Sequence, residues 1–95
     1  MLFIIHAVDR ADALDVRLAH YEAHKQFVSN IADFDMHVVM SGPLVSDDGH
    51  TAIGSFYLVE AQGRDAVMRF NQADPFYQAG IWENISISAF ARRQG

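Results

Sequence analysis

Residues 37–59, HVVMSGPLVSDDGHTAIGSFYLV, consist of two apolar stretches joined by a polar turn, and they decide the fold. The turn Ser46-Asp47-Asp48-Gly49-His50 contains Asp-Gly, a pair typical of tight hairpins because both residues tolerate left-handed backbone. We therefore predict a strand over residues 37–41 and another over residues 52–59, paired as antiparallel neighbours. The first is expected to end at Gly42-Pro43, since proline cannot donate to a strand ladder.

The residues before this hairpin indicate a strand followed by a long helix. Residues 2–8 are apolar and strand-like, and residues 13–32 place apolar side chains at helical spacings of three, four and seven. Asp12 is the candidate N-cap, since its side chain could accept from free backbone N–H groups at the helix start. The stripe expected to face the core comprises Leu14, Leu18, Tyr21, Val28 and Ala32, widened by Phe27 and Ile31.

The residues after the hairpin indicate a second helix and a last strand. The helix is expected over residues 63–73, stopping before Pro75 because proline disfavours helical geometry in the residue that precedes it. Its inward side chains are expected to be Ala66, Val67, Phe70 and Ala73. Residues 75–80 are expected to be irregular, and residues 82–90 alternate as a strand. Its two faces are expected to be Ile85 and Ile87 on one side, and Trp82, Asn84, Ser86, Ser88 and Phe90 on the other.

The element order is therefore βαββαβ, which predicts a ferredoxin-like α+β domain over residues 1–95. Its four-stranded antiparallel sheet should hold both helices on one face, because each crossover prefers the right hand. The other face is left bare and is far from polar. We expect a second copy of the chain to cover it, which makes the assembly a homodimeric α+β barrel.

Composition excludes several functions. The chain has no cysteine, so disulfides, zinc-thiolate sites and thiol nucleophiles are excluded. Its net charge is −5 and its basic residues are scattered, which argues against nucleic-acid binding because that function needs a basic stripe. The apolar run at the N-terminus ends at Val8, too short for a signal segment or a membrane span. We expect a cytoplasmic protein that does not bind membranes.

Several motifs, spread over nearly the whole chain, resemble the YciI-like (YCII-related) family. The most specific is Asp74-Pro75-Phe76-Tyr77-Gln78-Ala79-Gly80 after an amphipathic helix. The others are Leu2–Val8, Arg17-x6-His24, Ser41-Gly42-Pro43-Leu44 and Gly54-Ser55. The resemblance implies a dimeric α+β barrel with a site around a helical His and the Asp of the Asp-Pro motif. These roles would belong here to His24 and Asp74.

The resemblance extends to muconolactone-isomerase-like and dehydrochlorinase-type proteins, which act on small ring compounds. The chain departs from the family pattern at two places. Tyr21-Glu22 replaces an Arg-Pro pair that is common before the His, and Ala89 replaces a proline common in the last strand. The missing arginine weakens the case for an anionic substrate.

His24 and Asp74 are the candidate catalytic pair. His24 lies at the border of the apolar stripe, and the ordinary histidine pKa of ~6.5 suits proton transfer at cellular pH. Asp74 could hold the imidazole in one tautomer, as carboxylates do in catalytic dyads. Two plainer interpretations stay open: His24 is a partly buried histidine bonded to a backbone carbonyl, and Asp74 makes a local Asx-turn before Pro75.

Arg17 and Ser41 are candidate substrate-binding residues. Arg17 could clamp a carboxylate or an oxyanion, or pair with a surface acid instead. Ser41 and the polar row of the last strand could bind a ligand inside the barrel, or bind water or the partner. His20 and His24 are four residues apart but lack a clear third ligand, so no metal is expected. No nucleophile-elbow motif or phosphate loop occurs.

The residues thus favour a cofactor-free lyase or isomerase that acts on a small cyclic or enolisable compound. His24 would remove a proton beside a carbonyl, Asp74 would stabilise the charged imidazole, and Arg17 would bind the enolate oxygen. A non-catalytic domain that binds a small metabolite is the alternative. A cofactor-free monooxygenase is a weaker third hypothesis, because fold analogy alone supports it.

Overall fold

The computed structural model describes all residues from Met1 to Gly95. The elements along the chain are β1 (Leu2–Asp9), α1 (Leu14–Ser29), a 3-10 helix (Ile31–Phe34), β2 (His37–Val45), β3 (Ala52–Glu60), α2 (Arg64–Ala73), α3 (Pro75–Gln78) and β4 (Trp82–Phe90). They form an α+β fold of ferredoxin-like topology, as the sequence predicts. None of the helices combines the length and the apolar character needed to cross a membrane.

The four strands form one antiparallel sheet in the order β2-β3-β1-β4. At its centre Ile5 pairs with Tyr57 of β3 on one side and with Ile87 of β4 on the other. The predicted pairing of β2 with β3 is confirmed. The predicted end of β2 is wrong, because the strand continues through Pro43, which pairs with Ser55. An edge strand tolerates proline there because its outer N–H groups need no partner.

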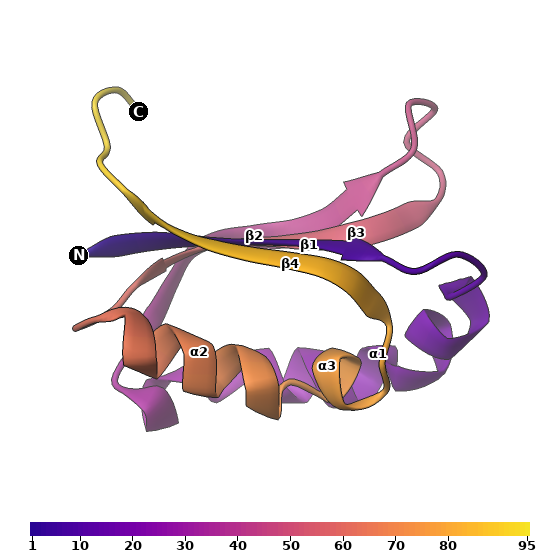
Figure 1. The fold of residues 1–95 in the computed structure, drawn as a ribbon, viewed down its shortest axis with the longest axis horizontal. Coiled ribbons are helices and arrows are strands. Elements are labelled where there is room, and N and C mark those ends of the chain that lie inside the picture. The colour runs from indigo at the N-terminus through magenta and orange to yellow at the C-terminus, as the bar shows by residue number, and fades with distance from the viewer.

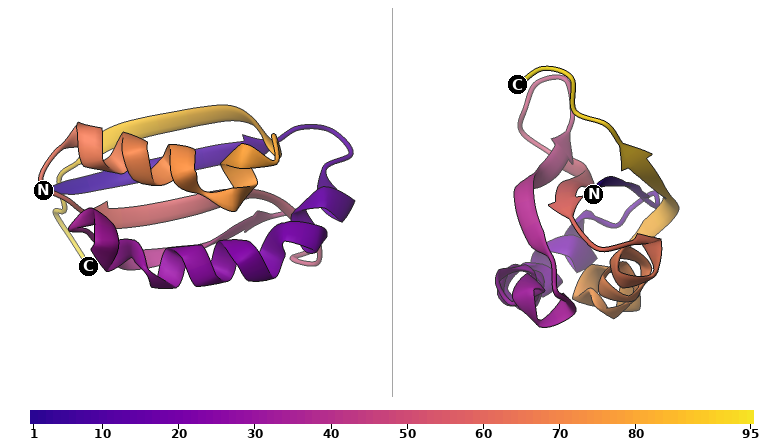
Figure 2. Two further views of the ribbon diagram at one scale, coloured as in Figure 1. Left: turned by 90° about the horizontal axis from the view of Figure 1, so that it is seen from below. Right: turned by 90° about the vertical axis from the view of Figure 1, so that its left-hand side faces the viewer.

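The helices cover one face of the sheet and leave the other bare (Figure 1). Helices α1 and α2 run side by side beneath the sheet, with α3 continuing the line of α2 (Figure 2). The C-terminal segment and the β2–β3 turn both project on the bare side (Figures 1 and 2). The site residues described below come from the helix-covered side.

The core lies between the sheet and the helices and is rich in aromatic rings. Phe70 of α2 is fully buried and packs against Phe27, Phe34 and Tyr57, with ring centroids 5.1, 5.6 and 5.9 Å away. The predicted inward residues Ala66, Val67 and Phe70 are confirmed. Ala73 is exposed instead, and Asn71 takes the buried position one helical turn from Val67.

The predicted core stripe of α1 is wrong in phase. Leu18 and Tyr21 are 64% and 49% exposed, while Arg17 of the same helix is buried at 5%. Leu14 and Ala32 are also exposed, whereas Phe27, Val28 and Ile31 do pack on the core. At 100° per residue the predicted stripe lies roughly 90° from the sheet-facing side. The apolar spacing marks the edge of α1, and its inward face is partly polar.

The start and end of α1 also differ from the predictions. Asp12 has φ +60° and precedes the N-cap, which is Ala13. The helix ends at Ser29, and residues 31–34 form the separate 3-10 helix.

The segment after α2 and the start of β4 show two further differences. Residues 75–78, expected to be irregular, form α3 with Pro75 at its first turn. Trp82 lies on the helix side, with its ring 6.0 Å from that of Phe76, because a register shift beside Asp9 reverses the alternation of β4. Phe90 is opposite Leu2 on the bare face, as predicted.

Replacing Phe70 with alanine should destabilise the fold by about 3–5 kcal/mol, because it removes the ring at the centre of the aromatic cluster. Urea denaturation followed by circular dichroism would measure the loss. Met68→Ala, on the exposed side of the same helix, is the matched control and should cost less than about 0.5 kcal/mol. Equal losses for both variants would contradict this assignment of the core.

Candidate functional site

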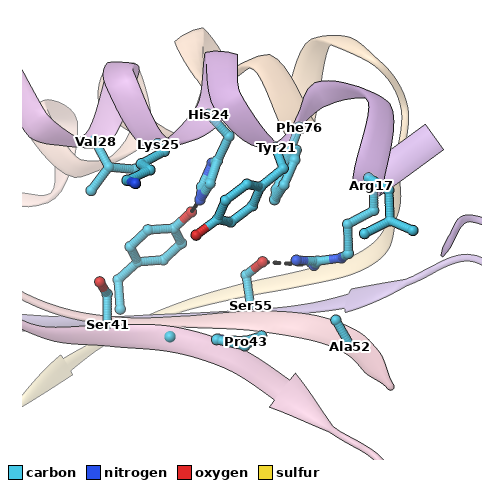
Figure 3. A pocket seen from close by; sticks show the side chains of 13 residues that line it. Arg17, Tyr21, His24, Lys25, Val28, Ser41, Pro43, Ala52, Ser55 and Phe76 are labelled. Carbon is cyan, nitrogen blue, oxygen red and sulfur yellow. Dashed lines mark hydrogen bonds between the residues drawn. The ribbon is translucent and has the colours of Figure 1, made fainter. Parts of the chain in front are cut away.

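A cavity of about 460 Å³ lies between α1 and strands β2 and β3 (Figure 3). Thirteen residues line it, and the apolar stripe predicted for α1 supplies three of them, the exposed Leu18 and Tyr21 and the half-buried Val28. The spacing that suggests a core stripe in the sequence therefore builds a cavity wall. Arg17 and His24 also line the cavity from α1. They are seven residues apart, close to two helical turns, so both point from nearly the same side of the helix.

His24 and Asp74 are in direct contact across the fold. His24 Nδ1 lies 2.9 Å from Asp74 Oδ1 and 3.1 Å from Oδ2. An ionised carboxylate only accepts hydrogen bonds, so the Nδ1–H of His24 donates. The neutral imidazole then has its lone pair on Nε2, the nitrogen on the far side of the ring from Asp74. This tautomer is the one that a general base at Nε2 requires.

Asp74 is fully buried and accepts from two further donors. The backbone N–H of Phe76 donates to Oδ1 at 2.8 Å, and the hydroxyl of Tyr57 donates to Oδ2 at 3.0 Å. The first of these bonds caps α3, so the local turn foreseen for Asp-Pro does form. The same carboxylate also holds His24. The turn and the contact with His24, which the sequence left as alternatives for Asp74, thus occur together, and His24 Nδ1 bonds this carboxylate and not a backbone carbonyl.

The His24 ring is held by packing as well as by Asp74. It stacks on Phe76 with centroids 3.9 Å apart and planes 3° from parallel, and its side chain is 15% exposed. The Tyr57 ring meets it edge-on at 6.2 Å. Phe76 and Asp74 both belong to the Asp-Pro-Phe motif, which therefore supplies the orienting carboxylate and the stacking surface at once.

Tyr57 is a site residue that the sequence interpretation missed. Its hydroxyl lies 3.5 Å from His24 Nε2 while donating to Asp74, and its ring lines the cavity. Burial, together with the nearby Asp74 charge, raises the pKa of Tyr57 far above its ordinary value near ~10. The phenol therefore stays neutral. The sequence places Tyr57 among the inward-facing residues of β3, but this position is equally typical of a tyrosine in the core, so it does not identify a site residue.

Arg17 is buried and held by two other elements. Its Nε and Nη2 donate to the two carboxylate oxygens of Asp9 at 2.7 and 2.8 Å, and Nη2 also donates to Ser55 Oγ at 2.8 Å. The guanidinium carbon lies 4.7 Å from the centroid of Phe76. Neither hydrogen of Nη1 has a protein partner. Arg17 therefore presents two fixed, unused N–H donors at the cavity. Its acidic partner is Asp9, a buried carboxylate, and not one of the surface acids that the sequence suggested.

The remaining predicted ligand-binding residues divide between the two faces of the sheet. Ser41 lines the cavity opposite α1. Asn84, Ser86 and Ser88 lie on the bare face and are exposed, so the predicted polar row does not line this cavity. His20 donates from Nδ1 to the Val16 carbonyl at 2.9 Å. The structure shows no cluster of three His, Cys, Asp or Glu side chains arranged to hold a metal ion.

Burial of Tyr57 predicts a specific alkaline loss of stability. In the unfolded chain Tyr57 ionises near pH ~10, whereas the raised pKa keeps it neutral in the folded state. The resulting stabilisation is complete below about pH 10 and is lost as the pH rises above it. Tyr57→Phe should reduce the slope of unfolding free energy against pH, above about pH 10, by up to about 1.4 kcal/mol per unit.

Urea unfolding of both proteins between about pH 8 and pH 11 would measure these slopes. Tyr77→Phe, at an exposed position, is the control and should retain the parent slope. A parent slope in the Tyr57→Phe variant would mean that Tyr57 ionises alike in the folded and unfolded states.

Comparison with known proteins agrees with this fold and places the chain in a family. The chain is 29% identical to Protein YciI of Escherichia coli O6:H1 and of Shigella flexneri, over 97% of this chain and 98% of each relative. Among solved structures, the chain resembles 5-chloro-2-hydroxyhydroquinone dehydrochlorinase (TftG) from Burkholderia phenoliruptrix, with a TM-score of 0.86 and 29% identity. The match covers 98% of this chain and 96% of that chain, and the dehydrochlorinase was solved in complex with 2,5-dihydroxybenzoquinone.

A second solved structure shows how widely the fold is shared. At3g17210 from Arabidopsis thaliana has a TM-score of 0.52 and 10% identity, with 99% of this chain and 96% of that chain covered, which indicates the fold alone. The family model of the YCII-related domain matches residues 1–91, nearly the whole chain. The chain therefore belongs to the YCII-related family.

Proposed function

We propose that this protein is a lyase or isomerase that acts on a small enolisable ring compound, with His24 as general base. The observation that supports this most directly is the contact of His24 with a fully buried Asp74 at the wall of a cavity. That contact leaves Nε2 as the basic atom. Similarity to a dehydrochlorinase over almost the full length supports the same class of chemistry.

The first step would be proton transfer to His24. Nε2 would take the proton from a carbon beside a carbonyl, and the C–H electron pair would form the enolate double bond while the carbonyl oxygen becomes anionic. Asp74 would stabilise the imidazolium through its Nδ1–H contact. The Tyr57 oxygen, 3.5 Å away, could accept from the protonated Nε2 as the ring adjusts. A positioned base of this kind contributes ~10²–10⁴-fold.

Arg17 would stabilise the anionic oxygen. Its two free Nη1 hydrogens are held in place by the Asp9 and Ser55 contacts, so they need no reorganisation when charge develops. Ser41 would add a hydroxyl from the opposite wall. The enolate would then either accept a proton at another carbon or expel a leaving group from the adjacent one. Neither route transfers electrons to a separate acceptor, so the proposal requires no cofactor.

The alternative is a non-catalytic domain that binds a small metabolite. The same cavity supports it, because a ring compound could be held by Arg17 and the aromatic walls without any proton transfer. The two proposals differ in what they require of His24. An enzyme needs the basic Nε2, whereas a binding domain needs the shape and polarity of the side chain.

We expect the protein to release chloride from 5-chloro-2-hydroxyhydroquinone, the compound that gives the similar dehydrochlorinase its name, by acting on the keto tautomer, which carries the C–H beside a carbonyl. His24→Gln should lower kcat by about 10²–10⁴-fold, since glutamine keeps the polar side chain but cannot take the proton. Asp74→Asn should preserve binding and lower the rate. Chloride release and, separately, calorimetric binding of 2,5-dihydroxybenzoquinone would measure the two effects.

His50→Gln, in the β2–β3 turn outside the cavity, is the control for losing a histidine. Thermal melting would verify that the Asp74→Asn variant remains folded. Binding of the quinone without chloride release in the parent protein would favour the non-catalytic proposal. Full turnover by His24→Gln would exclude His24 as the base.

We also propose that the protein is a homodimer joined through the bare sheet face. That face holds Ile4 and Leu58 at its centre, with Met40 and Phe90 exposed at its sides. Glu60 lies at its rim and pairs with the amino group of Met1.

Sedimentation at micromolar concentration should therefore give about twice the 10.6 kDa monomer mass. Met40→Asp should shift the protein toward the monomer, because Met40 is 54% exposed in the single chain and dimerisation would bury the new charge. Met68→Asp, on the exposed side of α2, places the same charge away from the bare face and should leave the mass unchanged. A monomer mass for the parent protein would rule out this assembly.

A further inference from the structure

The charges at the cavity differ from those of the chain as a whole. The chain has twelve acidic residues against seven Lys and Arg, yet none of the thirteen residues lining the cavity is acidic. Arg17, Lys25 and His24 are the ionisable nitrogen groups among them. The cavity is therefore a basic region on an acidic protein.

The two carboxylates behind the cavity wall are already paired. Asp9 receives two hydrogen bonds from Arg17, and Asp74 receives those of His24, Tyr57 and the Phe76 backbone. Lys25, by contrast, makes no ion pair within 4.0 Å and no hydrogen bond. It is also the single lysine of the chain. Lys25 is thus the uncompensated positive charge at the cavity.

Arg17 and Lys25 lie at opposite ends of the cavity wall. They are eight residues apart on α1, a rise of about 12 Å along the helix axis. Tyr21 and His24 lie between them (Figure 3). A ring compound beside His24 would therefore have a fixed guanidinium near one edge and an ammonium group on a flexible stem near the other.

We propose that this cavity selects ring compounds that are already anionic, and that Lys25 is the residue that determines this selectivity. This inference deepens the proposed function, since it concerns the same cavity, but it depends on binding and not on turnover. Arg17 would bind the oxygen whose charge develops during proton transfer. Lys25 would attract a second oxygen that is ionised before binding, and so discriminate against neutral rings of the same shape.

The test compares two quinones of the same ring in the parent protein and in Lys25→Gln. At neutral pH 2,5-dihydroxybenzoquinone is anionic, whereas 2,5-dimethoxybenzoquinone is neutral. Lys25→Gln should weaken binding of the anion by about tenfold, the typical loss of a hydrogen bond to a charged group. It should change binding of the neutral compound less than about twofold. Added salt should weaken anion binding more in the parent than in the variant.

Arg69→Gln is the matched control, because it removes one positive charge from an exposed position on α2 outside the cavity. It should bind both compounds as the parent does. Equal losses for the two quinones in Lys25→Gln would overturn the inference, since Lys25 would then act through packing. So would an unchanged affinity for the anion, equal loss in Arg69→Gln, or no binding of the anion by the parent up to about 1 mM.

These results are separable from those on catalysis. Charge selectivity in a protein that turns over no substrate would preserve this inference while the enzyme proposal fails. If Lys25→Gln turned over substrate at the parent rate and bound both quinones with the parent affinity, the enzyme proposal would stand and this inference would fail.

Discussion

A fully buried carboxylate, that of Asp74, links the parts of the structure on which the site depends. Burying a charge is costly unless hydrogen bonds compensate it, and here three donors do so from three elements: His24 of α1, Tyr57 of β3 and the backbone N–H of Phe76 in α3. Each donor must reach the same group. The position of α1 over the sheet, the start of α3 and the orientation of the His24 ring are therefore set together.

The polar inward face of α1 follows from this arrangement. A helix that packed only against a core would direct its apolar stripe at the sheet. In α1 that side holds Arg17, paired to Asp9, and His24, paired to Asp74, while Leu18 and Tyr21 border the cavity from the helix edge. Core packing is supplied instead by α2 and the aromatic cluster around Phe70. The two helices thus have different tasks: α2 stabilises the sheet, and α1 presents polar groups to a cavity.

The chemistry that we propose depends on which groups can ionise. Tyr57 is held neutral by burial and by the Asp74 charge, so it can donate to the carboxylate and still offer its oxygen to His24. Arg17 is held by Asp9 and Ser55, which leaves Nη1 free at the cavity. Arg17 and His24 are each held by a separate carboxylate, so both can face one substrate from fixed positions.

The sequence alone was enough to predict the order of the elements, the hairpin at 46–50 and most of the core face of α2, because turn chemistry and hydrophobic period are local. It also pointed to His24, Asp74, Arg17 and Ser41, through motifs and a family resemblance. The other features depend on contacts between elements that are distant in the chain. The phase of α1 could not be predicted, because an apolar cavity wall and a core stripe have the same spacing. The roles that we propose for Tyr57 and Lys25 depend on where β3 and α1 meet, and this contact joins residues far apart in the chain that no local pattern relates.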